Sequence, residues 1–190
     1  MKLNKKMWSN IIFVIVIAAL IYPNSRAFIM RQLAFAPSVS SVSKSPTLQD
    51  YNWQLQGLNT SDINFVSLKE EVVFVNIWAT WCPPCRAEMP LIQKLYDDYK
   101  DKVKFVLVTS DTEQKVMSYY KEHSLDFPTY NMQSREPSLF TTRSIPATFI
   151  VSKNGKVVVS TVGAADWNSK KIRKLLDKLL SEERNKVANR

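Results

Sequence analysis

The sequence predicts an α/β fold in which helices flank a central mixed β-sheet. Two short apolar runs rich in β-branched residues, at 72–78 and 103–109, are each followed by a segment with helical character. This alternation favours parallel pairing of the two strands through a right-handed crossover. Two further apolar runs, 147–151 and 156–161, flank the turn Lys153-Asn154-Gly155 and predict an antiparallel hairpin. Both kinds of pairing together make the sheet mixed.

The remaining elements of the domain, which we place at residues 50–182, follow in order. Short strands at 51–55 and 63–68, joined around Gly57-Leu58-Asn59-Thr60, predict an N-terminal β-hairpin extension. A helix should run from residue 83 to about 99, and a second from 112 to 123 with Asp111 or Thr112 as its cap. A short strand at 129–132, a helical turn at 137–140 and an amphipathic helix at 167–180 complete the domain.

The chain before the domain predicts a membrane anchor. Residues 1–6 form a basic stub. Residues 7–23 are uncharged and contain an apolar run at 11–22, so that they come close to the length of about 17–25 residues that a spanning helix needs. A cleaved signal sequence is the alternative, because Ala34-Phe35-Ala36 offers a cleavage pattern. Pro37 follows that pattern and two arginines precede it, so we favour an uncleaved anchor. Residues 24–49 read as a tether, because their Ser- and Pro-rich part lacks a helical period.

The net positive charge of the chain is concentrated at its two ends. The formal net charge is +9, yet residues 37–169 carry 13 basic and 14 acidic side chains, so the excess lies before and after them. This distribution agrees with a cytoplasmic N-terminus, an extracytoplasmic (periplasmic) catalytic domain and a basic C-terminal tail at 183–190. The neutral middle shows no basic stripe with interleaved aromatic residues. We therefore expect no nucleic-acid partner.

Both cysteines of the protein lie in one motif, Cys82-Pro83-Pro84-Cys85. Cys82 falls near the N-cap of the expected helix, and Pro83 occupies the first turn, where proline is favoured. The unpaired N–H groups and the positive end of the helix dipole then stabilise a thiolate at Cys82, which we predict to be the nucleophile. Cys85, three residues later on the same helical face, can resolve a mixed disulfide formed at Cys82.

Three other roles for the cysteine pair are disfavoured. A zinc site usually needs four ligands, and this chain offers two cysteines and His123, so we expect no metal. A c-type haem site requires histidine directly after the second cysteine, where Arg86 stands. A purely structural disulfide would close a very small loop and stabilise little. The redox-active disulfide itself is then the prosthetic element, with no further cofactor.

Two segments carry a resemblance to a known family. The segment Trp78-Ala79-Thr80-Trp81-Cys82-Pro83-Pro84-Cys85-Arg86-Ala87-Glu88-Met89-Pro90 resembles the active-site signature of the TlpA/ResA-like thioredoxin family of membrane-tethered or exported thiol–disulfide oxidoreductases. The segment Ser144-Ile145-Pro146-Ala147-Thr148-Phe149-Ile150-Val151 resembles the one that carries the cis-proline facing the cysteines in that family. The resemblance covers roughly residues 55–180 and implies a thioredoxin fold with a hairpin extension.

The resemblance also implies roles for residues around the cysteines. Glu88, on the same helical face as Cys85, can take up or return a proton during exchange, and the glutamate of the family motif is implicated in that task. Asn76 departs from thioredoxin, which has a buried aspartate at this strand position, and leaves Glu88 as the proton-handling candidate. For substrate contact we select the residues nearest the pair, namely Trp81, Pro83, Pro84, Ile145 and Pro146.

These features predict an extracytoplasmic disulfide reductase. Reduced Cys82 would attack disulfides of exported proteins, with apocytochrome c as one substrate class that the resemblance suggests, and a membrane thiol-reducing electron donor would recharge the pair. Three alternatives stay open. They are a disulfide-donating oxidase of the same fold, a thiol peroxidase, for which Thr80 is one residue too close to Cys82, and a non-catalytic tethered binding module that uses the groove between Trp81 and Pro146.

Overall fold

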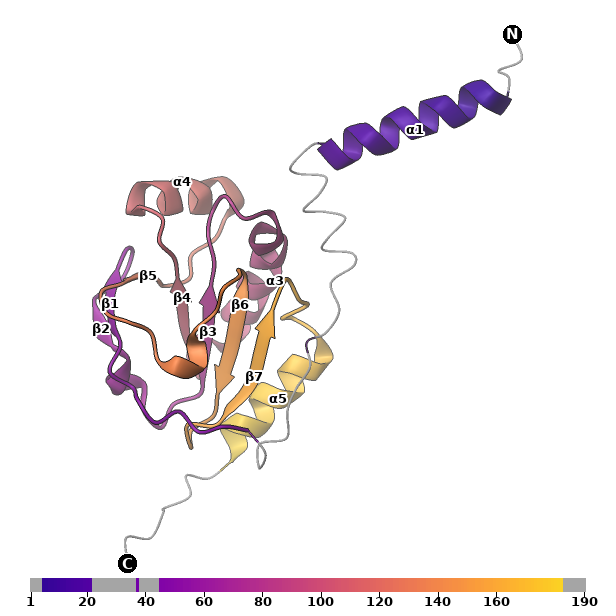
Figure 1. Cartoon of the computed structure of the whole chain (residues 1–190). Helices are drawn as coiled ribbons and strands as arrows, with labels where there is room; N and C mark the ends of the chain where they lie inside the picture. The colour runs from indigo at the N-terminus through magenta and orange to yellow at the C-terminus, as the bar shows by residue number, and fades with distance from the viewer. Residues whose placement is uncertain (1–4, 22–36, 38–44, 183–190) are drawn as a thin grey trace, which may run out of the picture.

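The order of elements in the chain is that of an α/β domain preceded by one helix. The structure is a computed structural model that describes residues 5–21, 37 and 45–182. Its elements are α1 (Lys5–Ile21), β1 (Gln54–Gly57), β2 (Ile63–Asn64), η2 (Phe65–Leu68), β3 (Val73–Ile77), α3 (Pro83–Tyr99), β4 (Lys104–Val108), α4 (Glu113–His123), β5 (Thr129–Met132), η3 (Ser138–Phe140), β6 (Ala147–Val151), β7 (Val157–Val162) and α5 (Lys170–Ser181) (Figure 1). The predicted tail at 183–190 and most of the predicted tether at 24–49 lie outside the described residues.

The sheet is mixed, as the sequence predicts. Within the described residues it has seven strands in the order β2-β1-β5-β4-β3-β6-β7, so that β2 and β7 form its two edges (Figure 1). The central strands β3, β4 and β5 are parallel to one another, whereas β6 is antiparallel to both β3 and β7. The carboxyl ends of β3 and β4 therefore lie side by side, which places the segments that follow these two strands together.

Two hydrophobic clusters cover opposite faces of the sheet. Phe74 belongs to the cluster that joins apolar side chains of α3, α4 and α5, whereas its neighbours Val73 and Val75 belong to the cluster that contains Trp53, Phe65 and other aromatic side chains of the N-terminal segment and η3. Successive strand residues point to opposite faces, so β3 is buried on both sides. This buried strand carries α3 and its cysteines.

The N-terminal strand pair differs in extent from the predicted hairpin. β1 and β2 pair antiparallel, with Leu55 opposite Ile63, but β2 contains two residues rather than six. The reason is local: the Asn64 side chain accepts a hydrogen bond from Val66 N and starts the 3-10 helix η2, so residues 65–68 leave the strand. β1 also pairs antiparallel with β5 and thereby extends the central sheet.

The C-terminal helix begins later than predicted. The sequence prediction started it at Trp167, whereas α5 starts at Lys170 with Ser169 as its N-cap. Asp166 forms a turn in between, accepting hydrogen bonds from the amides of Asn168 and Ser169. Trp167 consequently precedes the helix and is fully buried.

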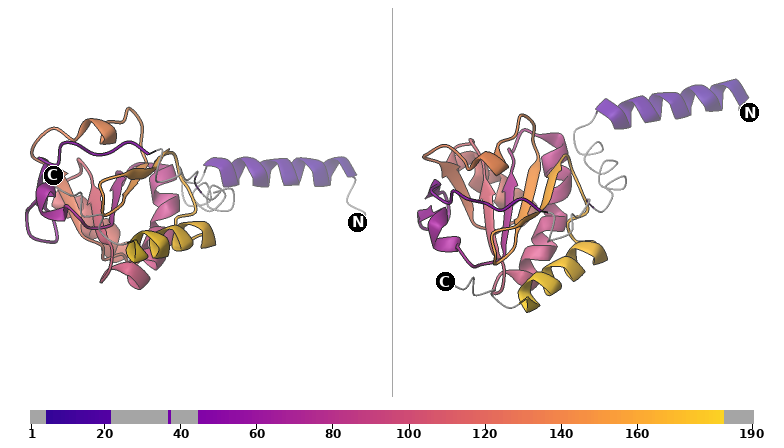
Figure 2. Two further views of the ribbon diagram at one scale, coloured as in Figure 1. Left: turned by 90° about the horizontal axis from the view of Figure 1, so that it is seen from below. Right: turned by 60° about the horizontal axis from the view of Figure 1, so that its bottom comes forward.

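Helix α5 packs beside the end of α3 (Figure 2). Arg173 forms an ion pair with Asp98 at 2.5 Å, and the Tyr99 hydroxyl donates to Asp177 at 2.8 Å. These contacts fix the carboxyl end of the cysteine-bearing helix against the C-terminal helix.

Helix α1 contains most of the predicted anchor. The apolar side chains of α1 whose burial is described are exposed, among them Trp8 and Phe13. Among the residues that the structure describes, no helix combines the length and the apolar character required to cross a membrane.

Candidate active site

Cys82 and Cys85 are joined by a disulfide at the start of α3. Cys82 is the N-cap residue and Pro83 the first helical residue, as the motif predicts, and Cys85 N lies 3.2 Å from Cys82 Sγ. Cys82 is 3 % exposed and Cys85 is fully buried. The sulfur that substrate can reach is therefore that of Cys82, which also faces the unpaired amides of the helix start.

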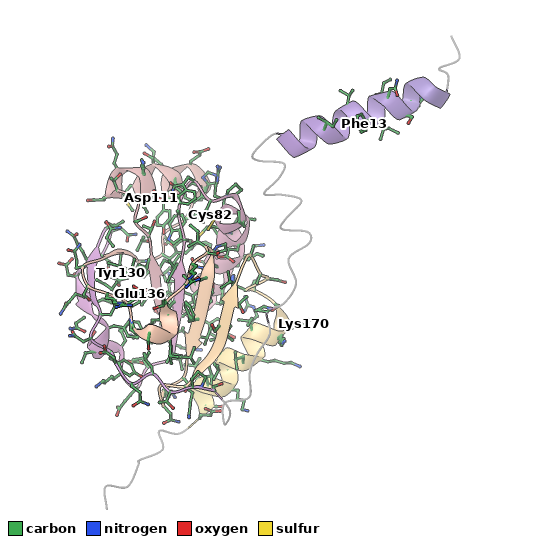
Figure 3. All side chains as sticks on the ribbon, viewed as in Figure 1. Phe13, Cys82, Asp111, Tyr130, Glu136 and Lys170 are labelled. Atoms are coloured by element: carbon green, nitrogen blue, oxygen red, sulfur yellow. A yellow bond between two sulfur atoms is a disulfide. The ribbon has the colours of Figure 1, made fainter. Side chains whose placement is uncertain are left out.

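A buried carboxylate holds the loop that leads into α3. Thr80 N donates to Asp111 Oδ2 at 2.7 Å, and Trp78 N donates to Val108 O at 2.9 Å. Asp111 was predicted as a possible cap of the second helix, but Thr112 is the N-cap of α4. Cys82 and Asp111 lie at the same end of the sheet (Figure 3). The contact between Thr80 and Asp111 follows from the parallel pairing of β3 and β4, because the segments after the two strands then lie next to each other.

The residues selected for substrate contact surround Cys82. Trp81 is 68 % exposed, Pro83 is exposed, and Pro84 and Ile145 are half-buried. The peptide bond between Ile145 and Pro146 is cis, and Pro146 is buried. Ile145 O lies 3.8 Å from Cys82 Sγ, a contact rather than a hydrogen bond, because a disulfide sulfur carries no hydrogen. The active-site loop and the cis-proline loop thus meet at one sulfur.

A cavity of about 300 Å³ adjoins this surface. Its lining includes the apolar side chains of Trp81, Ile145 and Phe140, together with the charged residues Glu136 and Arg143. It is open next to Trp81, so an extended segment of a protein substrate could place a side chain there while its disulfide approaches Cys82.

Glu88 is a buried residue of α3. It is 1 % exposed and one helical turn after Cys85. Asn76 Nδ2 donates to its Oε1 at 2.8 Å, while Trp167 Nε1 and Ala165 N donate to its Oε2 at 2.7 Å and 3.3 Å. Burial raises the pKa of Glu88 to about 8, even though all three hydrogen bonds act to lower it. The carboxyl group is therefore mainly protonated at neutral pH.

Asn76 links this carboxyl group to the cis-proline strand. The Asn76 side chain is fully buried and its Nδ2 also donates to Thr148 Oγ1 of β6 at 2.8 Å. Asn76 Oδ1 has no hydrogen-bond partner among the described residues. Sequence reasoning identified Asn76 but missed Thr148 and Trp167. Trp167 had been assigned to the helix as an apolar residue, and local periodicity carries no sign of a contact with Glu88.

In the described part of the chain, no group of three or more His, Cys, Asp or Glu side chains is arranged to hold a metal ion. His123 lies in the last turn of α4, where its ring packs on Tyr119 with centroids 4.2 Å apart.

Comparison with known proteins agrees with this geometry. The chain is 34 % identical over 115 residues to the thiol-disulfide oxidoreductase ResA of Bacillus cereus, an alignment that covers 59 % of this chain and 66 % of the relative. It is 36 % identical over 110 residues to the ResA of Oceanobacillus iheyensis, covering 56 % and 57 %. The chain thus spans less than two thirds of the length of either relative.

A solved structure shows the same fold. The crystal structure of a thiol-disulfide isomerase from Corynebacterium glutamicum superposes with a TM-score of 0.59 at 21 % identity, over 74 % of this chain and 99 % of that one. The predicted resemblance to ResA-like proteins with a thioredoxin fold is thereby confirmed. The family model named Redoxin matches residues 36–176, which is more than half of the chain. This protein belongs to the Redoxin family.

Proposed function

We propose that the protein is a thiol–disulfide oxidoreductase that reduces disulfides of other proteins through Cys82 and Cys85. The observation that carries this proposal is the disulfide at the start of α3, with the exposed Trp81 directly before it in the chain and the buried carboxyl group of Glu88 one helical turn after it. Substrate can approach one sulfur, while protons are exchanged behind the other. The names of the ResA relatives support the same activity.

The reaction begins with the reduced pair. The Cys82 thiolate attacks a substrate disulfide, and the bond between the two substrate sulfurs breaks as one of them leaves as a thiolate. Cys85 then passes its proton to the ionised form of Glu88 and attacks Cys82 Sγ, so that a bond forms between the two cysteine sulfurs. The electron pair of the broken mixed disulfide goes to the second substrate sulfur, which leaves as a thiolate. Two electrons pass from the cysteine pair to the substrate.

The proton affinities suit this transfer. An ordinary thiol has a pKa of about 8.5, and burial places the pKa of Glu88 at about 8. The raised pKa makes Glu88 a better proton acceptor for a thiol than an ordinary carboxyl group is. At Cys82, the helix N-terminus favours the thiolate that starts the reaction.

We extend the proposal to location and partners. The domain would work outside the cytoplasm, held by α1 at the membrane, on exported proteins including apocytochrome c, and a membrane thiol-reducing donor would recharge it. Support comes from residues 1–36, which carry five basic and no acidic side chains, and from the exposed apolar side chains of α1. The substrate class rests on the family resemblance.

Redox titration of the full-length protein tests the direction of electron flow. The Cys82–Cys85 pair is equilibrated with dithiol buffers and its oxidised fraction is measured by thiol labelling. We expect a potential of about −270 mV or lower, as for a reductase. A value near about −120 mV would assign the protein to disulfide formation instead.

Two controls address the other classes. Fast turnover of hydrogen peroxide by the reduced protein would identify a thiol peroxidase. A variant with both cysteines replaced by serine should lose all biological activity, whereas a binding module would retain it.

A further inference from the structure

One short segment contacts both halves of the active site. This segment, residues 163–167 between β7 and α5, is called here the β7–α5 connection. Gly163 N donates to Pro146 O at 2.8 Å, next to the loop that faces Cys82. Ala165 N and Trp167 Nε1 donate to Glu88 Oε2, behind Cys85. The connection therefore joins the substrate side of the disulfide to its buried side.

We propose that Trp167 is a positioning residue of the reaction, holding the Glu88 carboxyl group beside Cys85 and setting the pH at which that group exchanges its proton. This inference rests on the proposed function of Glu88 in thiol–disulfide exchange. It assigns to Trp167 an action through Glu88, without contact with the substrate.

The orientation of the indole is fixed by packing. Trp167 is fully buried, and its ring meets Phe74 of β3 edge-on with centroids 5.5 Å apart. A ring held in this way directs its single N–H at one point, and that point is Glu88 Oε2 at 2.7 Å. The carboxyl group consequently has one fixed oxygen, while Oε1 faces the side-chain amide of Asn76.

Not every buried indole N–H of this domain has a hydrogen-bond partner among the described residues. Trp53 Nε1 and Trp78 Nε1 are buried as well, and neither has a hydrogen-bond partner among the described residues. The protein thus tolerates an unpaired indole in its core at two positions. At Trp167 the N–H is instead paired with a buried carboxyl group, where a hydrogen bond to the ionised form is stronger than one between neutral groups.

Few groups face Glu88, so a small number of contacts determines how readily its carboxyl group loses its proton. On α3 the titratable neighbour is Cys85, one turn away; β3 contributes the neutral Asn76, β6 contributes Thr148 through Asn76, and the connection contributes Ala165 and Trp167. The three direct contacts are all donors, which favour the carboxylate and oppose the effect of burial. Loss of the Trp167 donor should therefore make Glu88 hold its proton to higher pH.

The test uses Trp167→Phe in the full-length protein, a change that keeps an aromatic ring and removes the N–H. In the oxidised form the cysteines do not titrate, so the carbon NMR signal of the Glu88 carboxyl group, identified by its loss in Glu88→Gln, reports the titration of Glu88 without a contribution from the cysteines. We expect the titration midpoint to rise by about one pH unit or more. The matched control is Trp53→Phe, which removes a buried indole without an N–H partner and should leave the midpoint unchanged.

Activity supplies the second measurement. In the reduced protein, the pH profile of mixed-disulfide resolution should shift upward in Trp167→Phe, and this shift should vanish when Glu88→Gln is already present. A purely structural role would slow resolution equally at every pH. An unchanged carboxyl midpoint or an unshifted profile in the folded variant would overturn the inference.

The wild-type chain provides a readout that needs no folded variant. The indole N–H resonance of Trp167 should change with pH at the Glu88 midpoint, whereas that of Trp53 should stay constant; a constant Trp167 signal contradicts the inference. The proposed function fails separately, if the wild-type dithiol does not reduce protein disulfides although Glu88 and Trp167 titrate together.

Discussion

The two sides of the Cys82–Cys85 disulfide differ sharply in their surroundings. On the Cys82 side, Trp81 is 68 % exposed and a cavity of about 300 Å³ opens beside it. On the Cys85 side, the cysteine is fully buried and Glu88 is 1 % exposed within a set of three hydrogen-bond donors. Only Pro83 and Pro84 separate the two cysteines in the sequence.

This contrast shows how one helix start can separate two requirements. Attack on a large substrate needs an accessible sulfur, whereas proton exchange with an activated carboxyl group needs shelter from water. Cys82 caps the helix directly after the exposed Trp81, whereas Cys85 lies within the first helical turn and is fully buried. Variants on the open side and on the closed side should therefore affect these two tasks separately.

The largest effects should come from the cysteines themselves. Cys82→Ser should abolish formation of a mixed disulfide, because the accessible nucleophile is lost. Cys85→Ser should form the mixed disulfide and accumulate it, because no thiol resolves it. Non-reducing gels and mass spectrometry of each variant with a disulfide-bonded substrate measure both outcomes. If the mixed disulfide accumulated in Cys82→Ser rather than in Cys85→Ser, the roles of nucleophile and resolving cysteine would be exchanged.

The closed side should also affect folding stability. The pKa of Glu88 is raised from 4.5 to about 8. Between these values the folded protein keeps a proton that the unfolded chain releases, so the free energy of unfolding should fall as pH rises through this range and level off above it. The change should amount to a few kcal/mol. Urea unfolding of the oxidised full-length protein at pH 5 and at pH 8 measures it.

Glu88→Gln is the control for this pH dependence. A glutamine amide at this position can accept from Trp167, and its NH₂ can donate to Asn76 once the Asn76 side chain turns its unpaired Oδ1 toward it. The variant should fold and lose most of the slope with pH. An equal slope in the variant would show that Glu88 does not cause it.

The open side should give the smallest effect. Trp81→Ala should raise KM for a disulfide-bonded protein substrate several-fold, with little change in kcat or in the redox potential, because the exposed ring adds apolar contact area alone. The matched variant Val66→Ala removes another exposed apolar side chain, in η2, and should leave KM unchanged. A large loss of kcat in Trp81→Ala would mean that the ring also acts on the sulfur.

Much of the fold could be predicted because the deciding signals are local. The buried run at β3, the proline-marked start of α3 and the hairpin of β6 and β7 each depend on residues adjacent in the sequence. The length of β2 and the start of α5 were predicted wrongly, because each depends on a capping or turn contact that hydrophobic periodicity does not reveal. Asn64 ended a strand by capping η2, and Asp166 formed a turn that delayed the start of α5.

The site could be predicted in part for the same reason. Cys82, Cys85 and Glu88 share one helix, so their spacing places them on related faces. Trp167 lies 79 residues after Glu88, and its contact exists because α5 packs beside α3. Such a contact depends on tertiary packing, and one sequence without relatives gives no measure of it.

The segment before β3 has a consequence for the solubility of the chain. Residues 46–48 pair with the start of β7 through Val157 N to Pro46 O and Leu48 N to Gly155 O, and β1 pairs along β5. This N-terminal segment thus pairs with β7 at one edge of the sheet and with β5 toward the other edge. A chain begun at residue 69 would leave the β5 edge unpaired and uncover apolar side chains such as Phe140. Open strand edges template pairing between molecules, so the shortened protein should aggregate even with its cysteine pair intact.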